Sequence, residues 1–260
     1  MKKMEIPMQL IDSHAHLTSS QLLDEADEII ARAFDAGVKQ IINICTDQKT
    51  TLEGIELAKK HEGIFNVGAT TPHDVKKIGE EDFLFFEKLA REKKFVAIGE
   101  TGLDYFYKHS DIKTQKAFLI RYLHLAQKLS LPIVIHCRDA FADLFSIADS
   151  EYKGPLVLHC FTGTIKEAQE VIKRGWMLSL SGIVTFKKSE ELREVAKIVP
   201  EDQLLIETDA PYLAPGKYRG RRNEPAYITE TLKVIADVRE VDTALIAQQT
   251  QKNAKSFFRL

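Results

Sequence analysis

The sequence predicts a single α/β domain over residues 1–260, a (β/α)8 barrel with extra helices at its C-terminal end. Three observations lead to this prediction. Short apolar runs recur eight times, helix-like segments separate them, and residues of metal-binding type follow five of the runs. A length of 260 residues is usual for one barrel of this kind.

The eight apolar runs predict strands that are buried on both faces. They are rich in β-branched residues and lack the polar–apolar alternation of a half-exposed strand. Such runs are typical of parallel sheets that helices cover. The predicted strands are Leu10–Ile11, Ile41–Cys45, Phe65–Ala69, Phe95–Ile98, Ile133–Ile135, Leu156–Leu158, Met177–Leu180 and Leu204–Ile206.

The segments between these runs predict amphipathic helices. Apolar side chains recur at helical spacing over residues 22–34 and 118–129, and two further helices are expected over 227–239 and 243–258. Thr50-x-x-Glu53 and Thr164-x-x-Glu167 predict capping boxes at the start of two helices. Strands and helices in alternation favour a closed barrel, with a doubly wound open sheet as the competing architecture.

The composition is that of a globular protein, with 44% hydrophobic residues, 28% charged residues and a net charge of −2. This charge excludes a broadly basic protein that coats DNA, so any contact with nucleic acid must come from a local basic patch. The three cysteines (Cys45, Cys137 and Cys160) form no CxxC pair, which suits a reducing compartment. No segment reads as a signal peptide or a membrane span, so we expect a cytoplasmic monomer without a membrane partner.

Residues that bind metals stand at the ends of the predicted strands. In the DSHAH segment after the first strand, the two histidines lie two residues apart and therefore point to the same side of an extended chain. The C-terminal strand ends of a barrel meet at one mouth, where the active sites of this fold lie. We expect one metal site from His14, His16, Glu100, His136, His159 and Asp209.

This ligand set predicts two divalent ions. Six ligands exceed the four that a single tetrahedral zinc ion uses. Nitrogen and oxygen ligands suit Zn²⁺, Mn²⁺, iron or nickel, and the carboxylates suit Mg²⁺, so the metal stays open. A carboxylate can bridge two cations and an imidazole cannot, which makes Glu100 the natural bridge. Two ions about 3.5–4 Å apart can generate a hydroxide nucleophile and clamp the oxygens of a phosphoryl group.

Six segments resemble the motif set of the TatD family of metal-dependent hydrolases, namely IDSHAHL, IGETGLDYFY, IHCRDA, LHCFTG, LIETDAPYL and RRNEP. They occur in the family's order from residue 11 to residue 225. The resemblance implies a barrel, Mg²⁺ or another divalent metal, and deoxyribonuclease activity, often 3′→5′ exonuclease. The ligands it implies are His14, His16, Glu100 and Asp209 for one ion and Glu100, His136 and His159 for the other.

One stretch departs from the family pattern. Members commonly show Gly-x-His-Pro-His after the third strand, and here this stretch reads Ala69-Thr70-Thr71-Pro72-His73. His73 is kept and is a candidate for substrate binding. Thr71 replaces the first histidine, which weakens the expectation of a substrate contact from this loop.

Three arginines near the expected mouth are further candidates for substrate binding. Arg138 is expected to grip a phosphate, with a salt bridge to Asp139 or Asp143 as the alternative. Arg221 and Arg222 belong to the densest basic run of the chain, which follows the eighth strand. We expect this run to contact phosphates, although basic runs are often only solvated surface.

The remaining candidates stand next to the expected ligands. Tyr105, like the two aromatic residues after it, is expected to stack on a base or else to pack in the structure. Asp104 is expected to orient a ligand or its loop, and Glu207 to bond a ligand histidine. Cys137 and Cys160 each follow a ligand histidine and are expected to point away from the ions.

The predicted reaction is hydrolysis of phosphodiester bonds in DNA, either single strands or 3′ ends. Catalysis is assigned to Asp209 and the bridging Glu100, with Asp209 taking a proton from the metal-bound water and passing one to the leaving 3′-oxygen. The main alternative is an amidohydrolase that acts on a C–N or ester bond of a small molecule or an aminoacyl-tRNA, because related barrels share this histidine and aspartate arrangement. Many of those carry lysine in place of Glu100. A non-catalytic metal- or nucleic-acid-binding module has no need of Asp209 beside a complete metal set.

Overall fold

The computed structural model describes residues 9–260 and contains one parallel sheet of eight strands. Neighbours in the sheet follow the order of the sequence. The strands are β1 Leu10–Ala15, β2 Val38–Cys45, β3 Ile64–Gly68, β4 Ala97–Asp104, β5 Ile133–Arg138, β6 Leu156–Leu158, β7 Met177–Leu180 and β8 Leu204–Ile206. This is the predicted (β/α)8 barrel, in which one strand–helix unit follows another.

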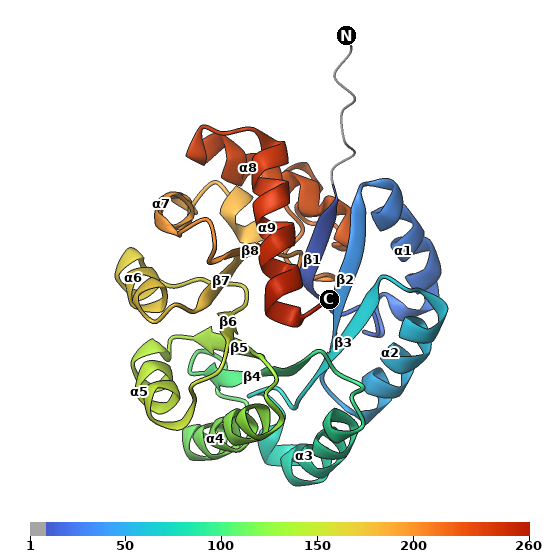
Figure 1. Ribbon diagram of the computed structural model, residues 1–260, viewed down its shortest axis with the longest axis vertical. Coiled ribbons are helices and arrows are strands. Elements are labelled where there is room, and N and C mark those ends of the chain that lie inside the picture. The colour runs from blue at the N-terminus through green and yellow to red at the C-terminus, as the bar shows by residue number, and fades with distance from the viewer. Residues whose placement is uncertain (1–8) are drawn as a thin grey trace.

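The helices form a ring outside the strands, except for the last one, which lies across the end of the barrel (Figure 1). Their apolar faces pack on the outer face of the sheet and build the larger of two core clusters. The helices are α1 Ala26–Asp35, α2 Gln48–Lys60, α3 Val75–Arg91, α4 Ile112–Leu129, α5 Phe141–Glu151, α6 Ile165–Lys173, α7 Glu190–Ile198, α8 Ile228–Arg239 and α9 Thr243–Phe258.

Helix α9 covers the end of the barrel where the strands begin. Asn253 on this helix donates hydrogen bonds to the carbonyl oxygens of Glu201 and Leu204, at 2.7 and 2.9 Å, next to the start of β8. Phe257 and Phe258 pack against residues that point into the barrel from the strands, and together they form the second core cluster. With this end closed by apolar packing, the opposite end remains for the polar residues.

Two of the predicted helix starts can be compared with the structure. Thr164 caps α6, and its side chain and that of Glu167 form the expected capping box. The box predicted from Thr50 and Glu53 is wrong, because α2 begins earlier and Asp47 is its N-cap. Asp47 accepts from the Thr50 backbone amide at 2.7 Å, so Thr50 is the third residue of the helix and not its cap. An aspartate cap three residues earlier offers the free amides a charged acceptor.

No helix among residues 9–260 is long and apolar enough to cross a membrane.

Candidate metal centre

Six polar side chains meet at the C-terminal ends of the strands. His14 and His16 come from the end of β1, and Asp209 follows β8. The Nε2 atoms of His14 and His16 lie 3.3 Å apart. Asp209 Oδ1 is 3.4 Å from His16 Nε2 and 3.8 Å from His14 Nε2. These three residues therefore aim their donor atoms at one point.

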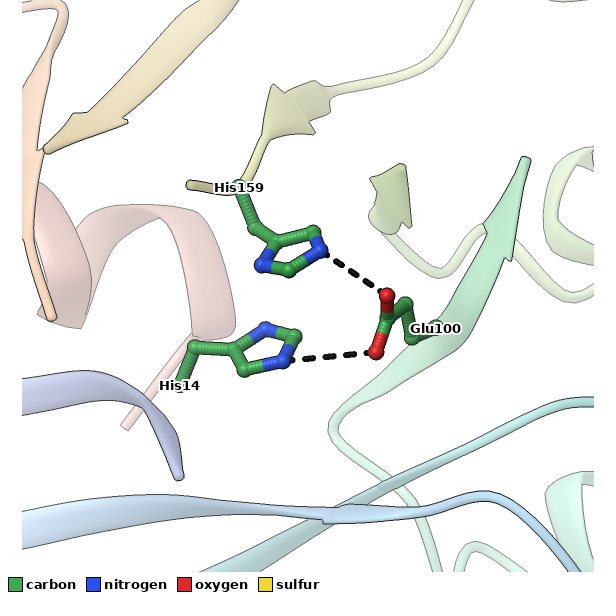
Figure 2. Close-up of side chains that lie close together, drawn as sticks. All are labelled: His14, Glu100 and His159. Atoms are coloured by element: carbon green, nitrogen blue, oxygen red, sulfur yellow. Dashed lines mark hydrogen bonds and ion pairs between the residues drawn. The ribbon is translucent and has the colours of Figure 1, made fainter. Parts of the chain in front are cut away.

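A second group lies on the other side of Glu100. His136 Nδ1 and His159 Nε2 are 3.0 and 2.9 Å from Glu100 Oε1. The other carboxylate oxygen, Oε2, is 3.5 Å from His14 Nε2 and 3.7 Å from His16 Nε2. Figure 2 shows Glu100 between His14 and His159, with a different oxygen directed at each ring. Each oxygen of Glu100 thus faces a different pair of histidines.

The conformation of β4 directs Glu100 into this position. The register between β4 and β5 shifts between Ile98 and Thr101, so the pairing of the two strands is irregular at Gly99 and Glu100. Gly102 has φ +150°, and a Cβ there would lie 1.9 Å from the carbonyl oxygen of His136. Only glycine fits this close approach of two strands. Ile98 packs in the cluster between the sheet and the helices and Ala97 in the cluster inside the barrel, so regular alternation would turn Glu100 toward the helices. The irregular pairing lets it face the mouth instead.

Backbone hydrogen bonds hold Asp209 beside the β1 histidines. The Asp209 amide donates to the His14 carbonyl oxygen at 2.9 Å, and the His16 amide donates to the Ala210 carbonyl oxygen at 2.7 Å. Asp209 has φ +56°, a left-handed conformation that aspartate adopts more readily than most residues. The turn after β8 is therefore fixed directly to the segment that carries His14 and His16.

Two further carboxylates contact the free nitrogens of the histidines. Asp104 Oδ2 is 3.0 Å from His136 Nε2, and Glu207 Oε1 is 3.4 Å from His159 Nδ1. Glu207 also accepts the backbone amide of Cys160 at 2.7 Å. The structure thus places Asp104 and Glu207 beside two of the histidines, Asp104 within hydrogen-bond distance of His136 and Glu207 at ion-pair distance from His159. A carboxylate in this position fixes the tautomer and the orientation of a metal-binding histidine.

The electrostatics favour an ionised carboxylate at the centre. Burial opposes ionisation of Glu100, but the charge of His159 and the hydrogen bonds of His136, His14 and His159 outweigh it and hold the pKa of Glu100 well below its usual range. Burial also opposes ionisation of Asp209, and His16 and His14 outweigh it and lower the pKa of that carboxyl group. Burial lowers the pKa of His14, which favours the neutral ring that binds metals.

The arrangement fits divalent metal ions. The rings of His14 and His159 stack with their centroids 3.8 Å apart, and the buried Nδ1 of His14 has no hydrogen-bond partner among the described residues. Imidazole nitrogens and two carboxylates that converge in this way suit cations between them, because two unprotonated nitrogens that face each other repel. Nitrogen and oxygen donors of this kind suit Zn²⁺, Mn²⁺ or Mg²⁺.

The centre opens into a cavity of about 840 Å³. His73 and Arg138, two predicted substrate-binding residues, line this cavity. Within residues 9–260, Arg138 forms no ion pair, so the alternative of a salt bridge to Asp139 or Asp143 is not realised. Its guanidinium lies over the ring of Phe106, 4.0 Å from the centroid. His73 Nε2 is 3.7 Å from Asp104 Oδ2.

The other predicted substrate-binding residues lie outside the residues that line the cavity. The Tyr105 hydroxyl donates to Asp143 at 2.7 Å, and its ring packs against the core. Arg222 forms an ion pair with Glu25 at 2.8 Å and donates to the Gln21 carbonyl oxygen. Arg221 is exposed. The structure therefore does not bring these three side chains to the metal centre.

One aromatic residue of the cavity, Tyr212, was not among the predicted site residues, whereas Phe106 and Tyr107 were expected, like Tyr105, to stack on a base or to pack. Phe106 and Tyr107 line the cavity, and Tyr105 does not. Tyr212 also lines it, with its ring centroid 5.8 Å from that of His16. Tyr212 stands three residues after Asp209 in the ETDAPYL segment, and this closeness in sequence was the available signal. A tyrosine beside apolar residues reads equally well as packing, so the signal is weak.

Comparison with known proteins gives consistent matches. The family model described as "TatD related DNase" matches residues 11–259. A metal-dependent hydrolase of Bacillus subtilis, YabD, described as uncharacterized, is 38% identical over 253 residues, which cover 96% of this chain and 99% of that protein. The 3′-5′ ssDNA/RNA exonuclease TatD of Cronobacter sakazakii is 36% identical, and the match covers 96% of this chain and 97% of that protein. The crystal structure of YJJV, a TatD homolog from Escherichia coli, superposes with a TM-score of 0.91 at 25% identity and covers 98% of this chain and all of its own.

Proposed function

Because the chain belongs to the TatD family of metal-dependent hydrolases, which act on ester bonds, we propose that it is a 3′→5′ exonuclease for single-stranded DNA that uses two divalent ions. One observation carries the proposal. Each carboxylate oxygen of Glu100 faces its own pair of histidines, at 2.9–3.7 Å, as a bridge between two cations requires.

The ligand sets follow from this division. His14, His16 and Asp209 would hold one ion together with Glu100 Oε2, and His136 and His159 would hold the second together with Glu100 Oε1. When bound, the ions would acidify a water molecule and neutralise negative charge on the phosphoryl oxygens. Glutamate as the shared ligand keeps the pair of sites less positive than a neutral bridge would.

The residues of the chain account for the proton transfers. Asp209 is ionised, since its pKa is lowered against burial by His16 and His14, and it can therefore accept a proton from the attacking water. As the bond between phosphorus and the 3′-oxygen breaks, the same carboxyl group can return the proton to that oxygen. The products are a shortened strand with a 3′-hydroxyl group and a nucleoside 5′-monophosphate.

The substrate class rests on two supports. The relative from Cronobacter sakazakii is named a 3′-5′ ssDNA/RNA exonuclease. In this chain, the Arg138 guanidinium lines the cavity without an acidic partner among the described residues, and a free guanidinium suits an anionic phosphate. A neutral amide substrate would have no use for a guanidinium group at this place.

The test is a 5′-labelled single-stranded oligonucleotide incubated with protein loaded with Mg²⁺, Mn²⁺ or Zn²⁺. We expect a ladder that shortens from the 3′ end. A circular single strand of the same sequence is the control, because it offers no end and should remain intact. Cleavage of the circle would indicate an endonuclease. Faster hydrolysis of a cyclic amide or a dipeptide than of DNA would favour an amidohydrolase.

A further inference from the structure

Two neighbouring aromatic side chains are exposed at the rim of the cavity. Phe106 is 56% exposed and Tyr107 is 52% exposed. Both line the cavity together with His136 and Arg138. Large apolar side chains gain about 1.5–3 kcal/mol from burial, so an exposed pair beside a site of chemistry calls for an explanation.

The aromatic pair is fixed to the metal centre through a single carboxylate. Asp104 Oδ1 accepts the backbone amides of Phe106 and Tyr107, at 3.0 and 2.7 Å. The other oxygen of Asp104 is 3.0 Å from His136 Nε2. The Asp104 side chain therefore holds both the backbone of the aromatic pair and the imidazole of His136. This fixes the position of the pair relative to the metal centre.

A cation accompanies the aromatic pair. The Arg138 guanidinium lies 4.0 Å from the centroid of Phe106 and 4.9 Å from that of Tyr107. The ring of His109 stacks on Tyr107 with 7° between their planes. Stacked aromatic and guanidinium planes next to a positive charge match an aromatic ligand that also carries an anion.

We propose that Phe106, Tyr107 and Arg138 form a stacking subsite for the base of the nucleotide whose phosphate lies at the metal centre. The proposal rests on the proposed function and adds how the terminal nucleotide is recognised. Every base has a π face, so such a subsite accepts all bases and requires an unpaired one. A paired terminal base must first leave its partner, which gives preference for single strands.

The contribution of the base to binding can be separated from that of the phosphate by comparing two small ligands. Thymidine 5′-monophosphate carries a base at C1′, where 2-deoxyribose 5-phosphate carries a hydroxyl group. Calorimetry on the metal-loaded protein measures their dissociation constants without any turnover. We expect the nucleotide to bind roughly 5- to 150-fold more tightly, the range for one stacked base. Phe106→Ala and Tyr107→Ala should each reduce this ratio, and Phe106→Trp should retain it.

Leu84→Ala is the matched control. Leu84 is 59% exposed on α3 and is not among the residues that line the cavity, so its truncation should leave the ratio unchanged. Equal affinity of the wild-type protein for the two ligands would overturn the stacking subsite. So would a Phe106→Ala variant that loses affinity for both ligands by the same factor. Neither result depends on whether the protein degrades oligonucleotides, which the labelled-strand assay decides separately.

Discussion

Oδ1 of the buried Asp12 side chain accepts the backbone amide of Thr208 at 2.9 Å across the line where β1 meets β8. The same oxygen accepts the His14 amide at 3.2 Å. Along this line the two segments share one isolated backbone bridge, Ala15 with Ala210, in place of a regular ladder. Asp12 therefore joins the segment that carries His14 to the turn that carries Asp209.

Asp12→Ala should weaken both the fold and the first metal site. Loss of the acceptor leaves two buried amides unpaired, and we expect the free energy of unfolding to fall by about 1–3 kcal/mol in a urea titration. Metal affinity should fall at the site of His14, His16 and Asp209, as measured by calorimetric titration. Ser13→Ala is the control. Ser13 Oγ also joins β1 to β8, since it donates to the Ile206 carbonyl oxygen at 2.9 Å, but it makes no bond to the turn that carries Asp209. Equal metal affinities of the two variants would refute the positioning role.

Asp209→Asn should lower turnover by about 10²–10⁴-fold and leave the fold intact. The amide nearly preserves the shape of the side chain but cannot take up a proton. Single-turnover rates on the labelled strand measure the loss, and circular dichroism checks the fold. Asp202→Asn removes the same charge from an exposed turn before β8 and should have the wild-type rate. An unchanged rate in Asp209→Asn would assign the base to another residue.

Hydrophobic patterning located all eight strands, but it placed several ends too early. The prediction ended the fourth strand at Ile98, whereas β4 continues through Glu100 to Asp104. β1 and β5 likewise continue into the polar segments that hold His14 and His136. In these three strands the first half is apolar and packs in the barrel, and the second half carries the polar residues of the mouth. The apolar run marks only the first half, whereas β6 and β8 are apolar throughout.

The candidate site, like the strands, could be predicted only in part. Its six metal-type residues could be predicted to converge because the fold itself brings strand ends together. Arg221 and Arg222 could not be placed, because the path of a long loop depends on partners that are distant in the sequence. Arg222 pairs with Glu25, which is 197 residues away in the sequence, and the nearby Glu224 pairs instead with Arg32 at 2.6 Å.

The salt dependence of DNA binding should separate the two arginines. Arg222 is held by Glu25, whereas Arg221 is exposed and has no ion pair in the described part of the chain. If Arg221 contacts a phosphate, Arg221→Ala should reduce the log–log salt slope by roughly 0.7 for a single strand. Arg222→Ala should change the slope much less. Equal slopes for wild type and Arg221→Ala would remove this loop from DNA binding.

The double variant Cys137→Ala with Cys160→Ser should keep its metal content. Burial raises the pKa of both thiols, which disfavours the thiolate form that binds metal. The Cys160 sulfur lies 3.2 Å from the Ser181 hydroxyl, and the candidate ligand groups found over residues 9–260 contain no cysteine. Metal content is measured by elemental analysis after gel filtration. A folded variant that has lost an ion would contradict this assignment.

The central claim is that Glu100 bridges two ions, and anomalous scattering from crystals loaded with Mn²⁺ tests it most directly. We expect two peaks about 3.5–4 Å apart, the spacing of two-metal sites. One should lie among His14, His16, Glu100 and Asp209, and the other among Glu100, His136 and His159. A third group of possible ligands, His73, Asp104 and His136, lies beside them. A single peak, or a second peak in that third group with none between His136 and His159, would contradict the account.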